Sequence, residues 1–505
     1  MTYMYIQELI DSLVNYHCLT EVFFTGEILS VVNDSREANV SSAFIAIRGE
    51  HFDGHQAVDE LIQKRIPLII LEEATEEQIK EARFNGTCLV KVISTDRAQA
   101  ILASRFYDQP SEKLDIIAVT GTNGKTTTSN MISYMLEVLG HKTGMIGTIH
   151  YKVADQYFPA VNTTPNSLKM QKLFSEMLDA GCQDAVIEAS SHALVLGRLW
   201  QTQVDCAIFT NLTREHLDFH KTMDNYANAK SLLFAQLGQT FKNHKAKLAI
   251  VNQDDHYAKV MYQATGAALA TYSIIDPNAT AYADDIQSSN GVMNFSLHYK
   301  GERYPVSLNM LGHYNVMNYM AAFLCLKLYY GYSTTDILSA TKQFPGVSGR
   351  MQVINEGQPY TVVVDFAHTG DALQKVIEEL CPHTKGRLRV LFGHSGGNRD
   401  SAARPGLGDI LFTYADEIYF TADNPRHEPV DKIVSEMVAD HDEVPYHLIE
   451  KREEAIEKML LDANVDDVLL FAGKGGESYQ VLGDDYVPYN EAEVVIETVR
   501  RLMHE

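Results

Sequence analysis

The chain has 505 residues, which at about 150 residues per domain predicts two to four domains. Hydrophobic residues make up 45% and charged residues 21%, which excludes a disordered chain, and the net charge of −24 argues against binding to nucleic acid or to anionic membranes. The longest apolar runs are strand-sized, far below the roughly 20 residues of a membrane span, and the six cysteines contain no Cys-x-x-Cys pair. We therefore expect a cytoplasmic monomer with reduced thiols that binds neither nucleic acid nor membrane.

Apolar runs and helical patterns alternate along the chain, which predicts the α/β class and three blocks. In the first block, residues 1–110, strands are expected at 43–47 and 67–71, with a helix at 57–64 between them. The polar stretch 108–113 is expected to link this block to the next.

The second block, residues 111–343, continues the alternation and adds an antiparallel segment. Its predicted elements are strands at 114–120, 185–188, 206–210 and 248–252, an antiparallel β insertion over 282–307 and a helix over 315–330. The third block, residues 344–505, is expected to form strands at 361–365, 388–392, 417–421 and 467–472. Ligands of open α/β sheets bind beyond the carboxyl ends of the strands, and polar residues follow several of these predicted ends.

The sharpest motif, Thr-Gly-Thr-Asn-Gly-Lys-Thr-Thr at 120–127, follows a predicted strand and begins a predicted helix. Gly121 and Gly124 let the backbone approach phosphate oxygens, and the N–H groups at the start of a helix attract anions. Lys125 can reach the outer phosphates, and the threonines that follow it can bind Mg²⁺. The motif therefore predicts a nucleoside triphosphate site formed by Gly121, Thr122, Asn123, Gly124, Lys125, Thr126 and Thr127.

A carboxylate stands at the end of a second predicted strand, where Glu188 precedes Ala-Ser-Ser-His192. A carboxylate at a strand end that faces a phosphate loop is a suitable Mg²⁺ ligand, because Mg²⁺ prefers hard oxygen donors. Taken alone, a carboxylate at such a position is more often a solvated strand end, and the family resemblance described next assigns Glu188 and Thr126 to Mg²⁺.

The loop at 120–128 resembles the ATP loop of the Mur ligases, which build the peptidoglycan peptide in the bacterial cytoplasm. Other stretches resemble the same family in its own order, namely 34–36, 162–165, 188–194, 211–220, 226–234, 311–318, 349–351, 365–373 and 423–426. The resemblance implies the three-domain Mur ligase architecture, with a central P-loop ATPase-like parallel sheet and a C-terminal Rossmann-like domain. It assigns the UDP substrate to residues 1–110, ATP to 111–343 and the incoming amino acid to 344–505.

The resemblance also implies the reaction. A Mur ligase of this pattern uses ATP and Mg²⁺ to add the third amino acid to UDP-MurNAc-L-Ala-D-Glu through an acyl phosphate. The implied partners are this UDP-MurNAc-dipeptide and a free amino acid. The sequence Asp-Asn-Pro-Arg at 423–426 favours meso-diaminopimelate, because an arginine there can pair with a distal carboxylate that lysine lacks.

The resemblance assigns roles to individual residues. It implies that Lys125, Glu188, His216 and Lys230 are catalytic, and that Lys230 carries CO₂ as a carbamate that binds Mg²⁺, which requires a lysine with a lowered pKa. The implied ATP contacts outside the loop are Asn315, Arg350, Asp365 and His368. The implied substrate contacts are Ser35, Asn162, Thr163, Thr164, Ser190, Arg198, Arg399, Asp423, Asn424, Arg426, Gly473 and Glu477.

Three alternatives to a diaminopimelate ligase stay open. Gly476 stands where the family pattern has histidine, Asn398 where it has aspartate and Gly370 where it has proline, so a paralogue that uses L-lysine or another amine is one alternative. A P-loop kinase or signalling NTPase would share the phosphate loop but would not explain 162–165, 188–194 or 423–426. The third alternative is a nucleotide-binding protein without ligase activity.

Overall fold

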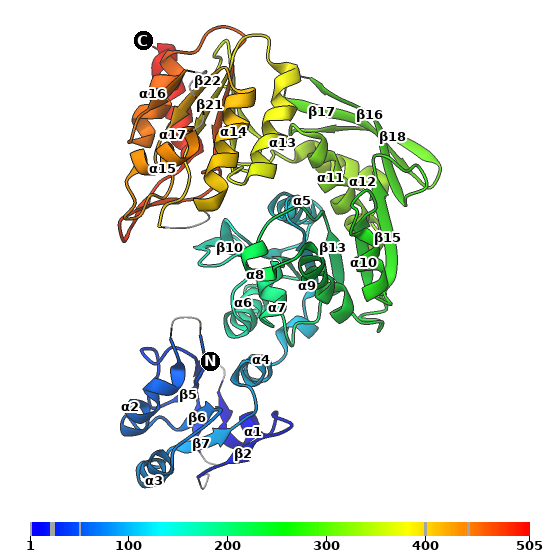
Figure 1. Ribbon diagram of the computed structural model, residues 1–505. Coiled ribbons are helices and arrows are strands. Elements are labelled where there is room, and N and C mark those ends of the chain that lie inside the picture. The colour runs from blue at the N-terminus through cyan, green and yellow to red at the C-terminus, as the bar shows by residue number, and fades with distance from the viewer. Residues whose placement is uncertain are drawn as a thin grey trace.

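The computed structural model describes residues 3–20, 26–49, 52–289, 291–397, 401–439, 441 and 445–504. It contains three large sheets that follow one another along the chain, so the predicted α/β class and three-domain architecture are confirmed (Figure 1). The blue N-terminal part lies apart from the yellow-to-red C-terminal part, and the cyan-to-green middle part lies between them.

The N-terminal part is built on a five-stranded sheet with the order β2-β7-β6-β5-β4. Four of its strands are parallel, and only β2 pairs in the antiparallel direction. The strands are β2 (His17–Cys18), β4 (Ser30–Val32), β5 (Ser42–Ile45), β6 (Leu68–Leu71) and β7 (Cys88–Lys91), with a separate pair β1 (Met4–Tyr5) and β3 (Glu27–Ile28). The helices are α1 (Ile6–Ile10), α2 (Val58–Gln63), α3 (Glu76–Asn85) and α4 (Thr95–Phe106).

The middle part is an eleven-stranded sheet with the order β11-β10-β9-β12-β8-β13-β14-β15-β16-β17-β18. The seven strands from β9 to β16 are parallel, and an antiparallel pair extends the sheet at each edge. The strands are β8 (Asp115–Thr120), β9 (Thr143–Ile146), β10 (His150–Val153), β11 (Gln156–Pro159), β12 (Asp184–Glu188), β13 (Cys206–Phe209), β14 (Leu248–Asn252), β15 (Ala268–Ser273), β16 (Ala281–Ser289), β17 (Val292–Tyr299) and β18 (Glu302–Leu308).

Helices cover both faces of this parallel region, which is why its strands are apolar without alternation. Side chains of α5 and α11 pack in one buried cluster, and those of α6, α7 and α9 pack in another. The helices are α5 (Lys125–Val138), α6 (Ser167–Asp179), α7 (Ser191–Val195), α8 (Leu217–His220), α9 (Met223–Gln236), α10 (Ala258–Ala264), α11 (His313–Leu324) and α12 (Thr334–Gln343).

The C-terminal part is a six-stranded sheet with the order β19-β20-β24-β21-β22-β23, parallel except for β19. Its strands are β19 (Gln352–Ile354), β20 (Thr361–Asp365), β21 (Leu388–Phe392), β22 (Glu417–Phe420), β23 (Tyr446–Leu448) and β24 (Val468–Ala472), with a hairpin of β25 (Tyr479–Leu482) and β26 (Asp485–Pro488). Its helices are α13 (Gly370–Leu380), α14 (Arg404–Tyr414), α15 (Val430–Val438), α16 (Arg452–Leu461) and α17 (Glu491–His504).

The structure contains strands that the predictions omit in all three parts of the chain. In the middle part the predictions omit β9, the β10–β11 pair and β15, which are four to six residues long. β9 pairs with β12, β15 pairs with β14, and β10 and β11 pair with each other. The antiparallel segment over 282–307 is not an insertion, because β16 pairs in parallel with β15 and continues the sheet. The helix predicted over 315–330 changes into a π-helical turn at Cys325–Tyr329.

Two further structural features bear on the expectations from composition. All six cysteines are free thiols. Among the described residues, no helix has the length and apolar character needed to cross a membrane.

The register of the middle sheet positions the site. Glu188 at the end of β12 pairs with Val119 of β8, and Phe209 at the end of β13 pairs with Thr120. The carboxyl ends of β12, β8 and β13 therefore lie at one edge of the sheet. The segments that follow these strands meet above that edge.

Candidate active site

The phosphate loop turns tightly between β8 and α5. Gly121 has a φ of +153° and Gly124 a φ of +84°, a region that residues with a Cβ rarely adopt. A Cβ on Gly121 would lie 1.8 Å from Thr210 Oγ1, and one on Gly124 would lie 2.3 Å from Asn318 Oδ1. Both glycines are therefore required by conformation and by space.

Lys125 is the first residue of α5, and its side chain folds back over the loop. Its Nζ donates hydrogen bonds to the carbonyl oxygens of Gly121 at 2.9 Å and Thr122 at 2.7 Å. Burial lowers the pKa of Lys125, while the charges of Glu215 and Glu188 oppose this shift. The ammonium group is thus held at the loop where phosphate oxygens would bind.

Glu188 is buried at the end of β12 and accepts hydrogen bonds from two hydroxyl groups. Its Oε2 accepts from Thr126 Oγ1 at 2.9 Å and from Thr148 Oγ1 at 3.0 Å, and its Oε1 accepts from the Thr148 backbone N–H at 3.0 Å. One carboxylate and two hydroxyl groups form a set of hard oxygen donors beside the phosphate loop. This donor set fits Mg²⁺.

Lys230 lies on α9 under the loop rather than in the cavity. Its Nζ donates a hydrogen bond to the Gly121 carbonyl oxygen at 2.7 Å and lies 4.6 Å from the centre of the Tyr226 ring. Burial, reinforced by the charge of Lys125, lowers the pKa of Lys230 well below its usual value. The side chain therefore has the environment that a reactive, neutral amine needs.

Three histidines gather beside Lys230. The ring of His192 lies 4.8 Å from that of His216 and 5.4 Å from that of His220, which in turn stacks on Tyr226. Burial lowers the pKa of His192 and His216. His216 adopts a left-handed backbone (φ +56°) and lines the cavity, as expected for a site-facing residue.

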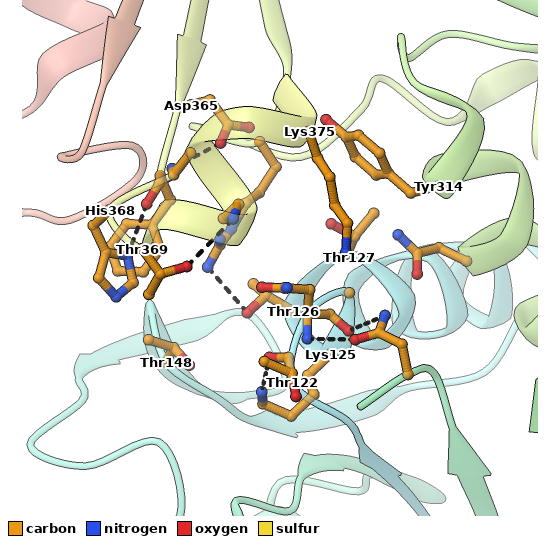
Figure 2. Close-up of a pocket in the computed structure, with 18 of the residues that line it drawn as sticks. Thr122, Lys125, Thr126, Thr127, Thr148, Tyr314, Asp365, His368, Thr369 and Lys375 are labelled. Atoms are coloured by element: carbon orange, nitrogen blue, oxygen red, sulfur yellow. Dashed lines mark hydrogen bonds between the residues drawn. The ribbon is translucent and has the colours of Figure 1, made fainter. Parts of the chain in front are cut away.

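The C-terminal part supplies the opposite wall of the cavity. Figure 2 shows Asp365, His368 and Thr369 across the cavity from the threonines and Lys125 of the phosphate loop. The Asp365 carboxylate itself accepts hydrogen bonds from the backbone N–H groups of Met351 and Ala367. Arg350 reaches the loop directly, because its Nη2 donates to Thr126 Oγ1 at 3.3 Å while its guanidinium stacks 4.3 Å from the centre of the Phe366 ring. Burial lowers the pKa of Arg350 and raises that of Asp365.

These residues enclose a cavity of about 370 Å³ between the middle and C-terminal parts. The structure brings most of the predicted ATP and metal residues to its lining: Thr122, Asn123, Gly124, Lys125, Thr126, Thr127, Glu188, Asn315, Arg350, Asp365 and His368. The predicted catalytic residue His216 and the predicted substrate residues Thr163 and Ser190 also line it. Gly121 and Lys230 lie behind this lining.

The predicted muramoyl-peptide residues form a hydrogen-bonded group next to Glu188. Thr164 Oγ1 donates to the Glu188 carbonyl oxygen at 2.6 Å and accepts from the Ser190 backbone N–H at 3.1 Å. Arg198 donates to the Thr164 carbonyl oxygen at 2.8 Å. The Asn162 carbonyl oxygen accepts from Tyr151 at 2.6 Å, which fixes the turn that contains Asn162 and Thr163.

The predicted amino-acid residues gather around the buried Lys474 in the C-terminal part. Lys474 Nζ donates to Asn424 Oδ1 and to Glu477 Oε2, both at 2.8 Å, and lies 3.6 Å from Asp423 Oδ1. Burial alone would raise the pKa of Asp423, but Lys474 and Arg452 outweigh it and the pKa is lowered. Gly473 begins this loop with a φ of +101°.

The remaining predicted residues lie apart from the cavity or outside the described residues. Arg426 has a left-handed backbone (φ +55°), and its Nε is buried without a hydrogen-bond partner in the described part of the chain. Ser35 follows β4 in the N-terminal part, away from the nucleotide cavity. Arg399 and Asn398 lie outside the described residues.

The predictions omit several residues of this site. Thr148 makes two hydrogen bonds to Glu188, and Tyr314 and Lys375 line the cavity (Figure 2). Thr148 follows β9, a strand that the sequence pattern did not predict, so the rule that ligands lie beyond strand ends could not be applied there. Lys474 lies within the 473–477 stretch, where only its neighbours are predicted contacts.

The sequence of this chain is similar to those of known ligases over almost its whole length. Three family models match the chain in order: "Mur ligase family, catalytic domain" at 27–107, "Mur ligase middle domain" at 119–326 and "Mur ligase, glutamate ligase domain" at 349–475. The UDP-N-acetylmuramoyl-L-alanyl-D-glutamate–2,6-diaminopimelate ligase of Bacillus cereus is 38% identical over 473 residues, which cover 94% of each chain. The chain belongs to the Mur ligase family.

Other Mur ligases align over almost the whole chain. The ligase of the same name from Oceanobacillus iheyensis is 36% identical over 500 residues, or 99% of each chain. A solved structure of a ligase of this name has a TM-score of 0.66 at 27% identity and covers all of both chains. The fold is also that of the MurF ligase of Thermotoga maritima in complex with ADP, with a TM-score of 0.63, 18% identity and coverage of 94% and 98%.

Proposed function

We propose that this protein is an ATP-dependent, ADP-forming amide ligase of the MurE type. It adds meso-diaminopimelate to UDP-MurNAc-L-Ala-D-Glu in peptidoglycan synthesis. The observation that carries the proposal is the 38% identity over 94% of both chains to a ligase named for this reaction. The cavity between the phosphate loop and Arg350 supports it, because an ATP-dependent ligase needs phosphate and metal groups at one place.

We assign the three parts of the chain to three ligands. Residues 1–110 bind the UDP end of the substrate, 111–343 bind ATP and 344–505 bind the incoming amino acid. The cavity supports the assignment of ATP, since it contains Lys125, Glu188 and the loop N–H groups. The ADP complex of a MurF ligase with the same fold also supports it.

Different residues of the cavity stabilise the phosphate charge and hold the metal. Lys125, the loop N–H groups and Arg350 neutralise the charge of the γ-phosphate. Thr126 and Glu188 would hold Mg²⁺, which would supply further charge neutralisation. The D-Glu carboxylate oxygen attacks the γ-phosphorus and ADP leaves, which gives an acyl phosphate. The amine then attacks the acyl carbon, loses a proton and displaces phosphate.

Lys230 is proposed as the carbamylated residue of this site. Its lowered pKa favours the neutral amine that reacts with CO₂. The carbamate anion so formed would offer a further hard oxygen donor for Mg²⁺. His216, which lines the cavity, is the proposed proton acceptor for the amine.

The choice of amino acid is tested by comparing candidate amino acids one at a time. Protein, ATP, Mg²⁺ and UDP-MurNAc-L-Ala-D-Glu are incubated with meso-diaminopimelate, L-lysine or L-ornithine in separate reactions, and product mass and phosphate release are measured. We expect product only with diaminopimelate, and phosphate release that depends on it. Phosphate release without an amino acid would favour a plain NTPase, and a lysine product would favour the paralogue.

A further inference from the structure

Asp371 of the C-terminal part makes hydrogen bonds to the middle part with a single carboxylate oxygen. Its Oδ2 accepts from Asn123 Nδ2 and from Thr213 Oγ1, both at 3.0 Å. Asn123 lies in the phosphate loop, and Thr213 lies in the segment that follows β13. Lys375, one turn further along α13, donates to the same oxygen at 2.9 Å.

The donor in the phosphate loop is held rigidly. The Asn123 backbone N–H donates to Asn211 Oδ1 at 2.9 Å, and its carbonyl oxygen accepts from Thr210 Oγ1 at 2.6 Å and from Asn211 Nδ2 at 3.1 Å. Because the backbone of Asn123 is fixed on both sides, its side-chain amide is a fixed point of attachment. A bond from Asp371 to this amide therefore connects α13 to the loop itself.

The position of Asp371 at the start of α13 determines which groups this connection places. The chain just before α13 carries Asp365 and His368, and α13 itself carries Ala372 and Lys375; all four residues line the nucleotide cavity. Asp371 is absent from this lining among the described residues. Its carboxylate thus contacts the loop from the side while its neighbours cover the ligand.

We propose that Asp371 is a positioning residue that holds the C-terminal part closed over the phosphate loop for ligation. The inference rests on the proposed ligase function. All three neighbours of Oδ2 are donors, and a charged acceptor forms stronger hydrogen bonds than a neutral one. The contact exists only when the two parts are together, so it stabilises the closed arrangement over any open one.

The test uses the full-length protein and the variants Asp371→Ala and Asp371→Asn. We expect kcat for ligation to fall roughly tenfold in Asp371→Ala and less in Asp371→Asn, which keeps the shape and one acceptor, with unchanged thermal stability. X-ray scattering should show that a non-hydrolysable ATP analogue plus UDP-MurNAc-L-Ala-D-Glu compacts the wild type more than Asp371→Ala. Wild-type kcat and wild-type compaction in Asp371→Ala would overturn the proposal.

A second variant tests the contact if Asp371→Ala fails to fold. Thr213→Val removes one middle-part donor without changing α13, and we expect a smaller loss of kcat and compaction in the same direction. Where Asp371→Ala folds, combining it with Thr213→Val should cause no further loss, because one contact is then removed twice, whereas additive losses would overturn the proposal. Asp409→Ala is the matched control, since this exposed aspartate on α14 pairs with His441 inside the C-terminal part.

Failure of the proposed function gives a different result. If the wild type joins no amino acid to the UDP-MurNAc-dipeptide, the ligase proposal fails. The role of Asp371 can still be tested, because X-ray scattering with the ATP analogue measures how far the wild type and Asp371→Ala each become compact. Equal compaction in both proteins would then overturn the role of Asp371. Reduced compaction in Asp371→Ala would support it.

Discussion

Thr126 Oγ1 donates a 2.9 Å hydrogen bond to Glu188 Oε2, although 62 positions separate the two residues in the chain. The contact joins the start of α5 to the end of β12 and forms the centre of the proposed metal site. It arises because β12 and β8 pair in parallel, so that their carboxyl ends lie together. Arg350 from the C-terminal part reaches the same hydroxyl group.

Removing the Glu188 carboxylate should weaken Mg²⁺ binding. Losing a residue that only supports a metal ligand typically lowers activity roughly 10–100-fold. We expect Glu188→Gln to lower the ligation rate by at least this factor, and to raise the Mg²⁺ concentration that gives half the maximal rate. Initial rates over a Mg²⁺ series measure both effects, and EDTA should abolish the remaining rate. Glu60→Gln, on the exposed face of α2, is the control. An unchanged Mg²⁺ dependence would refute the assignment.

Lys125→Ala should abolish ligation while the fold is kept. Its ammonium group sits on the phosphate loop, where it stabilises charge on the transferring phosphoryl group, and losing one such donor costs roughly 100–1,000-fold in rate. Phosphate release and circular dichroism are compared with those of Lys64→Ala, an exposed lysine that pairs with Glu60. Turnover at the wild-type rate would contradict the role.

Gly124→Ala should prevent ATP binding because of steric conflict rather than backbone conformation alone. Its Cβ would lie 2.3 Å from Asn318 Oδ1 at a φ of +84°. Gly140→Ala is a matched control, since Gly140 has a φ of +93° but a Cβ there would enter open space, with no close neighbour within 4 Å in the described part of the chain. Both variants carry the roughly 1–2 kcal/mol cost of a left-handed alanine, but only Gly124→Ala should lose ATP in calorimetric titrations. Equal ATP affinity in the two variants would count against this explanation.

Stability should decrease as the pH falls from 6.5 to 4, partly because of His220. Burial, together with the charges of His192 and His216, lowers the pKa of His220 to about 4. The unfolded chain takes up a proton near pH 6.5, whereas the folded chain does so near pH 4, so acid favours the unfolded state in this window. Urea midpoints at pH 7.5 and pH 4.5 should differ less in His220→Gln than in the wild type. An equal difference would exclude His220 as a contributor.

The sequence by itself identified the family and the phosphate site. The residues of 120–127 are contiguous, and local rules for glycine, lysine and helix N-termini apply directly to them. Several strands of the three sheets were also predictable, because short apolar runs bounded by polar residues are typical of buried strands. The family resemblance added Arg350, Asp365 and His368 to the predicted ATP contacts, and all three line the cavity beside the phosphate loop.

The tertiary structure alone decided how distant residues meet. Thr148 follows a strand that local pattern did not indicate, and its bonds to Glu188 exist only because β9 pairs with β12. The contact between Asp371 and Asn123 joins two parts of the chain whose arrangement no local rule determines. Sequence determines which groups are available for chemistry, whereas long-range strand pairing and the packing of the C-terminal part determine which of them lie within bonding distance.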